Sequence, residues 1–172
     1  MPTTPDKEQS CCCIGRDSFG HWLSGFVDGE GSFILQTQQR PGGFSCHASL
    51  RIELRDDDSD IINLIKDFWQ VGNIYMRKGR KRLDTTTKPN VQYVVSGWET
   101  LNTVIVPHFT KYPLRAKKKR DFEIWKDAVD FAYRVSLSRS NHKWTELYIE
   151  MFSNFVKRLN ETRLYTSTKL ET

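Results

Sequence analysis

Apolar residues first recur at helical spacing, and the pattern then changes to strict alternation. Trp22 and Leu23 are followed by Phe26 at intervals of four and three, which predicts a helix with Ser18 as its N-cap. Two strands follow, over residues 32–40 and 47–55, with a Pro-Gly-Gly turn between them. In both strands one face is apolar, whereas the other is rich in Gln, Arg, Ser and His. One face of the resulting sheet is therefore expected to be polar.

The pattern then repeats as a helix, two strands and another helix. Residues 56–59 supply an acidic and capping start for a helix that runs to Trp69. Two further strands are predicted over residues 73–78 and 90–97, and a short helix over residues 99–106. The residues of the 56–69 helix that are expected to point inward are Ile61, Ile62, Leu64, Ile65 and Phe68.

Two longer helices are predicted in the last third of the chain. The first covers residues 117–133, and residues 136–141 are interpreted as a linker. The last helix has an apolar stripe typical of packing on its own domain rather than on a cofactor. Its members are Trp144, Leu147, Tyr148, Met151, Phe152, Phe155 and Leu159. The sequence contains no internal repeat.

Length and charge narrow the class of protein. The 172 residues fit a single domain over residues 18–172, with a polar leader over residues 1–17 that is expected to be mobile. The formal net charge of +5 suits a polyanionic partner. The sequence has no apolar run that could span a membrane and no secretory or transit signal, so we expect a protein that stays where it is synthesised and is not secreted. Cys11–Cys13 lack zinc-ligand spacing and, like Cys46, are interpreted as reduced thiols.

The first helix combines two glycines with two carboxylates. Gly25 and Gly29 each cost about 1 kcal/mol relative to alanine, but at a spacing of four they leave a flat groove that a second helix can approach closely. Asp28 and Glu30 lie at the C-terminal end, where the macrodipole disfavours carboxylates. We therefore expect these acids to serve an external partner, such as a metal ion.

The segment LSGFVDGEG, from Leu23 to Gly31, resembles the signature of the LAGLIDADG homing endonucleases. The resemblance implies that Glu30, together with the Gly29 carbonyl, binds a divalent metal at the scissile phosphates, and that Asp28 is structural. In this family, the motif helix packs against a second motif helix. The residues that the resemblance places at that dimer interface are Leu23, Gly25, Phe26 and Gly29.

The same resemblance implies an α+β fold. Its αββαββα core would cover about residues 19–109 and contain a curved four-stranded antiparallel sheet. Extra C-terminal helices would cover about residues 116–163.

The polar sheet face favours contact with the major groove of double-stranded DNA, because Arg and Gln can pair bidentately with base edges. The alternative is an ordinary solvated sheet face. The negative charge of Glu53 would repel nearby DNA phosphates, but its carboxylate can accept a hydrogen bond from a cytosine amino group. A basic cluster at the end of the third strand and in the loop after it is interpreted as phosphate contacts, and its members are Arg77, Lys78, Arg80, Lys81 and Arg82. The expected DNA-binding residues are Ile34, Gln36, Gln38, Arg40, His47, Ser49, Arg51, Glu53, Arg55, Tyr75, Arg77, Lys78, Arg80, Arg82, Gln92, Val94, Lys117 and Lys119.

A second basic segment covers residues 111–120, and within it the stretch PLRAKK, from Pro113 to Lys118, resembles the stretch of the family that carries a lysine of the catalytic centre. The resemblance aligns this lysine with Lys117, with Lys118 as the alternate. Its role would be to stabilise charge on the phosphate and to polarise the attacking water. For each lysine the alternative is a solvated basic helix start. Asp56 is a further candidate, which would hold water or metal at the cleavage centre.

The sequence therefore favours a Mg²⁺-dependent, site-specific DNA endonuclease, with Mn²⁺ or Ca²⁺ able to occupy the site and Ca²⁺ giving no turnover. Because one motif supplies one acid and two strands must be cut, we expect a homodimer, a near-palindromic target and short 3′ overhangs. The alternatives are an RNA maturase that binds its own intron RNA and a non-cleaving DNA-binding regulator. The resemblance also implies an intron-encoded protein of an organelle (chloroplast or mitochondrion) or of the bacterial cytoplasm.

Overall fold

A computed structural model describes residues 15–41, 43–81, 86–138 and 144–168. The predicted leader, with Cys11–Cys13, lies outside the described residues up to residue 14, and its last two residues belong to the first helix instead. Among the described helices, none has the length and apolar character needed to cross a membrane.

The chain alternates helices with pairs of strands, in the predicted order. The elements are α1 (Arg16–Glu30), β1 (Gly31–Arg40), β2 (Gly43–Arg55), the 3₁₀ turn η1 (Asp56–Asp58), α2 (Ser59–Trp69), β3 (Asn73–Arg77), β4 (Arg80–Lys81), β5 (Thr86–Thr87), β6 (Asn90–Ser96), α3 (Trp98–Thr100), the π-helical η2 (Leu101–Ile105), α4 (Val106–Lys111), α5 (Lys118–Leu137) and α6 (Glu146–Thr168). This confirms the predicted α+β fold, to which β4 and β5 add a small hairpin.

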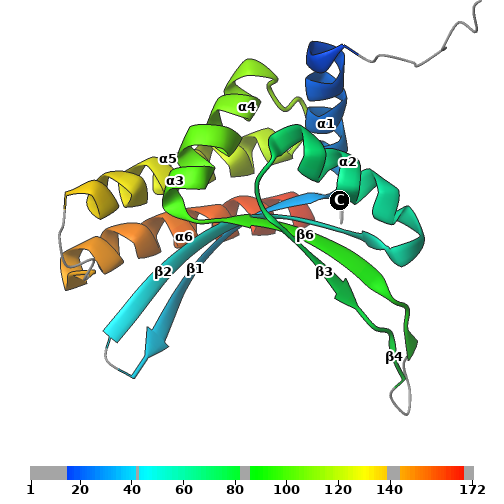
Figure 1. Ribbon diagram of the computed structural model, residues 1–172. Coiled ribbons are helices and arrows are strands. Elements are labelled where there is room, and N and C mark those ends of the chain that lie inside the picture. The colour runs from blue at the N-terminus through cyan, green and yellow to red at the C-terminus, as the bar shows by residue number, and fades with distance from the viewer. Residues whose placement is uncertain (1–14, 42, 82–85, 139–143, 169–172) are drawn as a thin grey trace, which may run out of the picture.

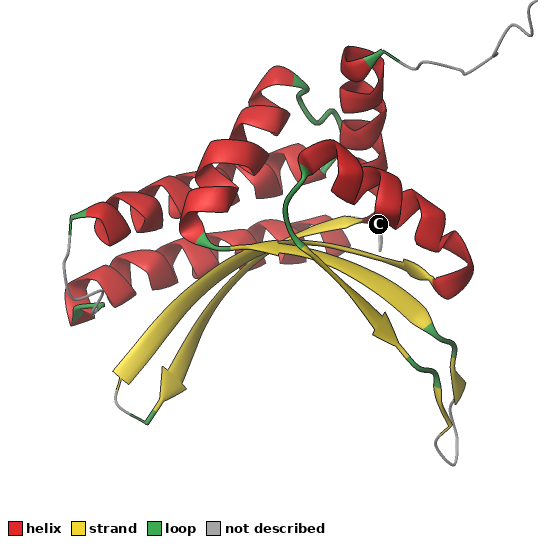
Figure 2. Ribbon diagram, in the orientation of Figure 1, coloured by secondary structure: helices red, strands yellow, loops and turns green. Residues whose placement is uncertain are grey.

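Four antiparallel strands form an arched sheet in the order β1-β2-β6-β3. Helices α1 to α5 lie on its convex side, and the concave side is open (Figure 1, Figure 2). The predicted alternation is confirmed, since Phe33, Leu50 and Tyr93 are fully buried on the helix side. Trp125 of α5 packs on Phe33, with ring centroids 5.1 Å apart. The polar residues at alternate positions therefore face the concave side.

The N-termini of α1 and α2 are not capped in the way that the sequence predicts. α1 begins at Arg16 after Gly15, so Ser18 lies inside the helix rather than at its N-cap. Asp58 holds the N-cap position of α2 but makes no capping hydrogen bond with its side chain. Asp57 instead forms an ion pair with Arg55 at 2.8 Å.

The short helix predicted over residues 99–106 is longer than expected. Helical winding continues through α3, η2 and α4, from Trp98 to Lys111, and the π-helical part ends two residues before Pro107. In α2, Ile62 and Ile65 are fully buried as predicted, but Leu64 is 55% exposed. Successive helix positions are turned by about 100°, which carries Leu64 off the buried face.

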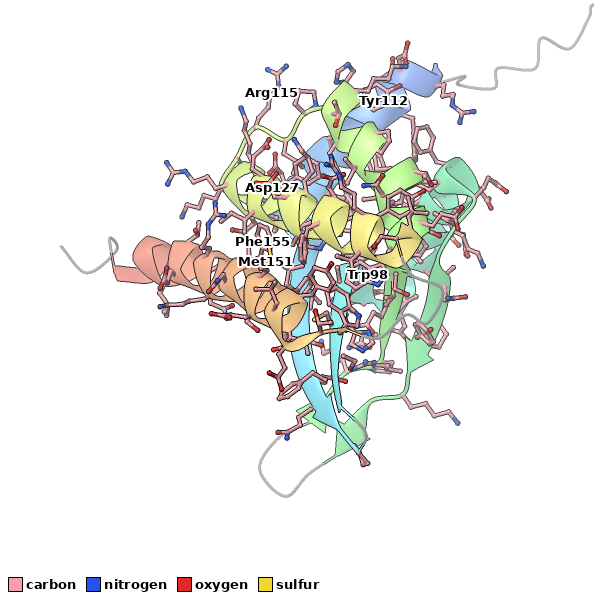
Figure 3. All side chains as sticks on the ribbon, turned by 90° about the vertical axis from the view of Figure 1, so that its left-hand side faces the viewer. Trp98, Tyr112, Arg115, Asp127, Met151 and Phe155 are labelled. Atoms are coloured by element: carbon pink, nitrogen blue, oxygen red, sulfur yellow. The ribbon has the colours of Figure 1, made fainter. Side chains whose placement is uncertain are left out.

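The last helix runs beside the edge strand β1 and along α5. Phe152 and Leu159 are buried, and Phe155 lies between α5 and α6 (Figure 3). Leu147 and Met151, which were expected in the same stripe, are 63% and 42% exposed because the buried face of α6 is narrower than the apolar stripe. Arg163 fixes the helix, since its guanidinium donates to the Phe33 carbonyl at 2.6 Å and contacts Asp121 at 2.8 Å.

Candidate functional site

The C-terminal end of α1 is held by a single lysine. Lys118 Nζ donates to the backbone carbonyls of Asp28, at 2.9 Å, and Gly29, at 2.6 Å. A helix leaves its last carbonyls without intrahelical partners, and a cation stabilises that negative end. Burial lowers the pKa of Lys118, whereas the charges of Asp28 and Glu30 act in the opposite direction. The ammonium group is therefore held at the carbonyl groups of the two residues that precede Glu30.

Of the two candidate lysines, Lys118 is the one that contacts the end of α1. Lys117 is exposed and occupies the position before α5, whereas Lys118 in the first turn reaches the end of α1. The difference follows from helix geometry, because adjacent residues point about 100° apart.

Asp28 connects α1 to the segment before α5. Its Oδ2 accepts hydrogen bonds from the backbone N–H groups of Arg115, at 2.7 Å, and Ala116, at 3.0 Å. Two such bonds order the segment that leads to Lys118. In this structure Asp28 is thus a structural acid, whereas Glu30, two residues further along the chain, is exposed.

Glu30 borders a surface depression of about 410 Å³ between α1, β2 and the turn before β6. Asp58, rather than Asp56, lines this depression, which also contains Lys88, a residue that the sequence analysis did not select. Lys88 lies far from Glu30 in sequence, so only the fold brings the two together. The full lining is Glu30, Glu53, Leu54, Arg55, Asp58, Lys88, Pro89 and Asn90.

The oxygen donors at this end suit a hard cation such as Mg²⁺, which is commonly held by one or two carboxylates together with water and phosphate oxygens. Glu30 offers an exposed carboxylate, and the Gly29 carbonyl, which accepts from Lys118, retains a second lone pair. Within the described residues, no three His, Cys, Asp or Glu side chains form a group that could hold a metal. Further ligands would have to come from water, from phosphate or from another motif helix.

One face of α1 is left open by its own chain. Gly25 and Gly29 are exposed, and an added Cβ at either position would meet nothing within 4 Å. Trp22, which the sequence analysis did not place at this face, is 42% exposed and stacks on Phe26 with ring centroids 5.2 Å apart. Leu23 is fully buried in the core, so its expected place at the dimer interface is wrong. The helix rotation turns Leu23 toward its own sheet.

Behind this open face, α1 is fixed to α4 by buried polar groups. Ser24 Oγ donates to the Tyr112 carbonyl at 2.6 Å and lies 3.3 Å from His108 Nε2. Because the single hydroxyl proton is used on Tyr112, His108 must donate from Nε2. Burial lowers the pKa of His108 to about 4, so the ring is neutral near pH 7.

The concave sheet face carries most of the predicted DNA-binding side chains. Gln36, Gln38, His47, Glu53, Arg55, Tyr75, Arg77 and Lys78 are exposed, and Ile34, Ser49, Arg51 and Val94 are half-buried. The exposed Lys117 and Lys119 lie at the start of α5, apart from the sheet. Arg40 and Arg80 lie in strands whose side chains at these positions are not described, and Arg82 lies outside the described residues.

Gln92 departs from the expectation of an accessible contact. It is only 2% exposed, because its amide is enclosed by Glu53, at 2.8 Å, and Arg77, at 3.2 Å. Both partners belong to neighbouring strands, so the side chain cannot be counted among the groups that reach a ligand.

Comparison with known proteins gives matches over most of this architecture. A family model described as LAGLIDADG endonuclease matches residues 23–129. The probable intron-encoded endonuclease 2 of Neurospora crassa is 33% identical over 121 residues, which are 68% of this chain and 25% of that protein. The chain thus spans about a quarter of that relative.

Solved structures share the fold at lower identity. The I-LtrWI LAGLIDADG homing endonuclease bound to target DNA superposes with a TM-score of 0.66 and 20% identity, over 90% of this chain and 46% of that one. I-SmaMI bound to an uncleaved DNA target in the presence of calcium ions gives a TM-score of 0.54 and 22% identity, over 78% of this chain and 48% of that one. The family match covers more than half of the sequence and includes both the end of α1 and Lys118. The chain belongs to the LAGLIDADG endonuclease family.

Proposed function

We propose that this chain is the DNA-binding and cleaving domain of a Mg²⁺-dependent, site-specific endonuclease. The observation that carries the proposal is the exposed carboxylate of Glu30 at the end of α1, where Lys118 lies 2.6 Å from the adjoining Gly29 carbonyl. An acid and a cation at one helix end, beside an open concave sheet, match what phosphodiester hydrolysis on duplex DNA requires.

In this proposal, different residues of the chain bind DNA, hold the metal and stabilise charge on the phosphate. The concave face holds Arg and Gln side chains that can pair with base edges, and basic residues beyond β3 supply phosphate contacts that set the register. Glu30 and the Gly29 carbonyl would hold the metal, which when bound activates water and stabilises charge on the phosphate oxygens. Lys118 would add a fixed positive charge where negative charge develops in the transition state. Asp28 keeps Lys118 in place through Arg115 and Ala116.

Cutting both strands requires a second acid, which we propose is the Glu30 of a second copy packed on Gly25 and Gly29. The open face of α1, with exposed Trp22 beside it, supports this homodimer and a near-palindromic target cut with short 3′ overhangs. A second candidate arrangement is a longer protein in which another repeat supplies the second motif helix. It is favoured by the fact that the chain spans less than half of the similar solved structures.

The test is Glu30→Gln, with Glu99→Gln as a matched control on the exposed surface of α3. We expect cleavage with Mg²⁺ to fall at least about a hundredfold in Glu30→Gln, because the proposed metal site loses its carboxylate ligand. Duplex binding should persist or tighten slightly, since a negative charge beside phosphate is removed. Gel-based cleavage and binding assays measure both quantities, and a fully active Glu30→Gln protein would refute the assignment.

A further inference from the structure

Four side chains on the concave face form a hydrogen-bonded row across β2, β6 and β3. We call Glu53, Asn90, Gln92 and Arg77 the polar ladder. Asn90 Nδ2 donates to one carboxylate oxygen of Glu53 at 2.5 Å, and Gln92 Nε2 donates to the other at 2.8 Å. At the far end, Arg77 Nη2 donates to Gln92 Oε1 at 3.2 Å.

The strand register explains why these side chains meet. Glu53 is paired with Gln92, and Asn90 is paired with Arg77, so all four point to the same face of the sheet. Glu53 and Asn90 also line the depression beside Glu30. The polar ladder therefore runs from the candidate catalytic end to the edge strand β3.

The chemistry of the partners fixes the orientation of the Gln92 amide. A carboxylate can only accept hydrogen bonds and a guanidinium can only donate them. A flipped amide would set a carbonyl against Glu53 and an NH₂ group against Arg77, which would replace two hydrogen bonds by two repulsive contacts. Because Gln92 is 2% exposed, water could not compensate for either loss.

Resting on the proposed function, we infer that the polar ladder holds the Arg77 guanidinium in one orientation so that it reads a guanine. Arg77 has five N–H donors, and the bond to Gln92 uses one of them. Guanine presents two acceptors in the major groove that match the arginine fork. A guanidinium that is already oriented loses less conformational freedom on binding than a mobile one. Arg77 is thus a specificity-determining residue.

Glu53 and Gln92 take a different role from the one expected of base-contacting residues. Both carboxylate oxygens of Glu53 accept from the polar ladder, and Gln92 is covered. They are positioning residues, which act on the DNA through Arg77. The expectation that Glu53 accepts from cytosine is replaced by this role.

The test is a selection of bound duplexes from a randomised library by the full chain in Mg²⁺-free buffer, followed by sequencing. The wild type should prefer guanine at one position of each half-site by roughly tenfold. Arg77→Lys keeps the charge but loses the fork, so this preference should fall to about twofold or less while the salt dependence of binding stays the same.

Gln92→Met and Glu53→Gln test the positioning role at the two inner members of the polar ladder. Both should weaken the preference at the same position and at no other. Gln39→Met makes the same chemical change on the opposite face of β1 and should leave the whole profile unchanged. Glu53 is exposed, so Glu53→Gln remains informative if Gln92→Met does not fold, which circular dichroism would report.

Two results would overturn the inference. If Arg77→Lys or Arg77→Ala weakens binding equally for all sequences, Arg77 is a phosphate contact. If Gln92→Met and Glu53→Gln leave the guanine preference intact, the ladder does not position Arg77. A wild type that binds no duplex at low salt would instead refute the proposed function, and the reading role of Arg77 with it.

Discussion

At the scale of single residues, the structure separates side chains that the sequence leaves equivalent. Lys117 and Lys118 are neighbours in one basic run, and only the start of α5 decides that Lys118 meets the end of α1. Similarly, the alternation in β6 places Gln92 on the polar face but does not show that Glu53 and Arg77 enclose it. Such contacts depend on strand register between distant segments, which a periodic pattern does not contain.

The two lysines give a matched pair of variants. We predict that Lys118→Met lowers the cleavage rate roughly a hundredfold, because a fixed charge beside the reacting phosphate is lost. Lys117→Met should lower it by no more than about twofold, as expected for one exposed charge in a basic region. Single-turnover cleavage at saturating protein measures both rates.

The opposite ranking, with Lys117→Met as the more damaged variant, would show that the alignment of the catalytic lysine with residue 117 is correct. Thermal unfolding of both proteins serves as the control, since Lys118 also stabilises the end of α1 through two carbonyls.

At the scale of elements, α1 has one face that packs on its own core and one face that is open. Leu23 and Val27 are fully buried and attach the helix to its own core, whereas Gly25 and Gly29 face open space. The open surroundings of both glycines agree with the face expected from their spacing of four, and the close partner that would explain their cost in a helix stays a prediction. The assignment of Leu23 to that face was wrong, because a nine-residue signature does not determine which side of the helix packs against its own core.

Gly25→Leu tests the open face. An added Cβ at this position would meet nothing within 4 Å in its own chain, so the fold should persist, but a second helix could no longer approach. We predict that the variant sediments as a single chain under conditions in which the wild type sediments as a dimer. Gly15→Leu, at a glycine that is also open but lies before α1, should leave the sedimentation unchanged.

An unchanged dimer in Gly25→Leu would remove the proposed contact between motif helices. A wild type that sediments as a single chain at all concentrations would favour the arrangement in which another repeat completes the site.

At the scale of the whole molecule, the order of elements could be predicted because each has a strong period of its own. Two alternating strand pairs and amphipathic helices require an α+β arrangement with one face of the sheet covered. The position of α6 could not be predicted, because it depends on Arg163 reaching both Asp121 and the Phe33 carbonyl. The depression beside Glu30 could not be predicted from the sequence either, because Glu53, Asp58 and Lys88 come from separate segments of the chain.

The arched sheet connects the polar concave face with the end of α1. Its concave face is open, and the end of α1 leads directly into the start of β1 (Figure 1). A duplex bound as proposed would therefore meet the predicted DNA-binding side chains and Glu30 together. The net charge of +5 favours such a partner.

The most direct measurement of this account is the recovery of cut ends from a randomised duplex library incubated with the full chain and Mg²⁺. We predict cut ends that share one long, near-palindromic sequence with short 3′ overhangs, and no enrichment when Glu30→Gln replaces the wild type. Equal recovery of cut ends from both proteins, or none from the wild type under conditions in which it binds duplex DNA, would contradict it.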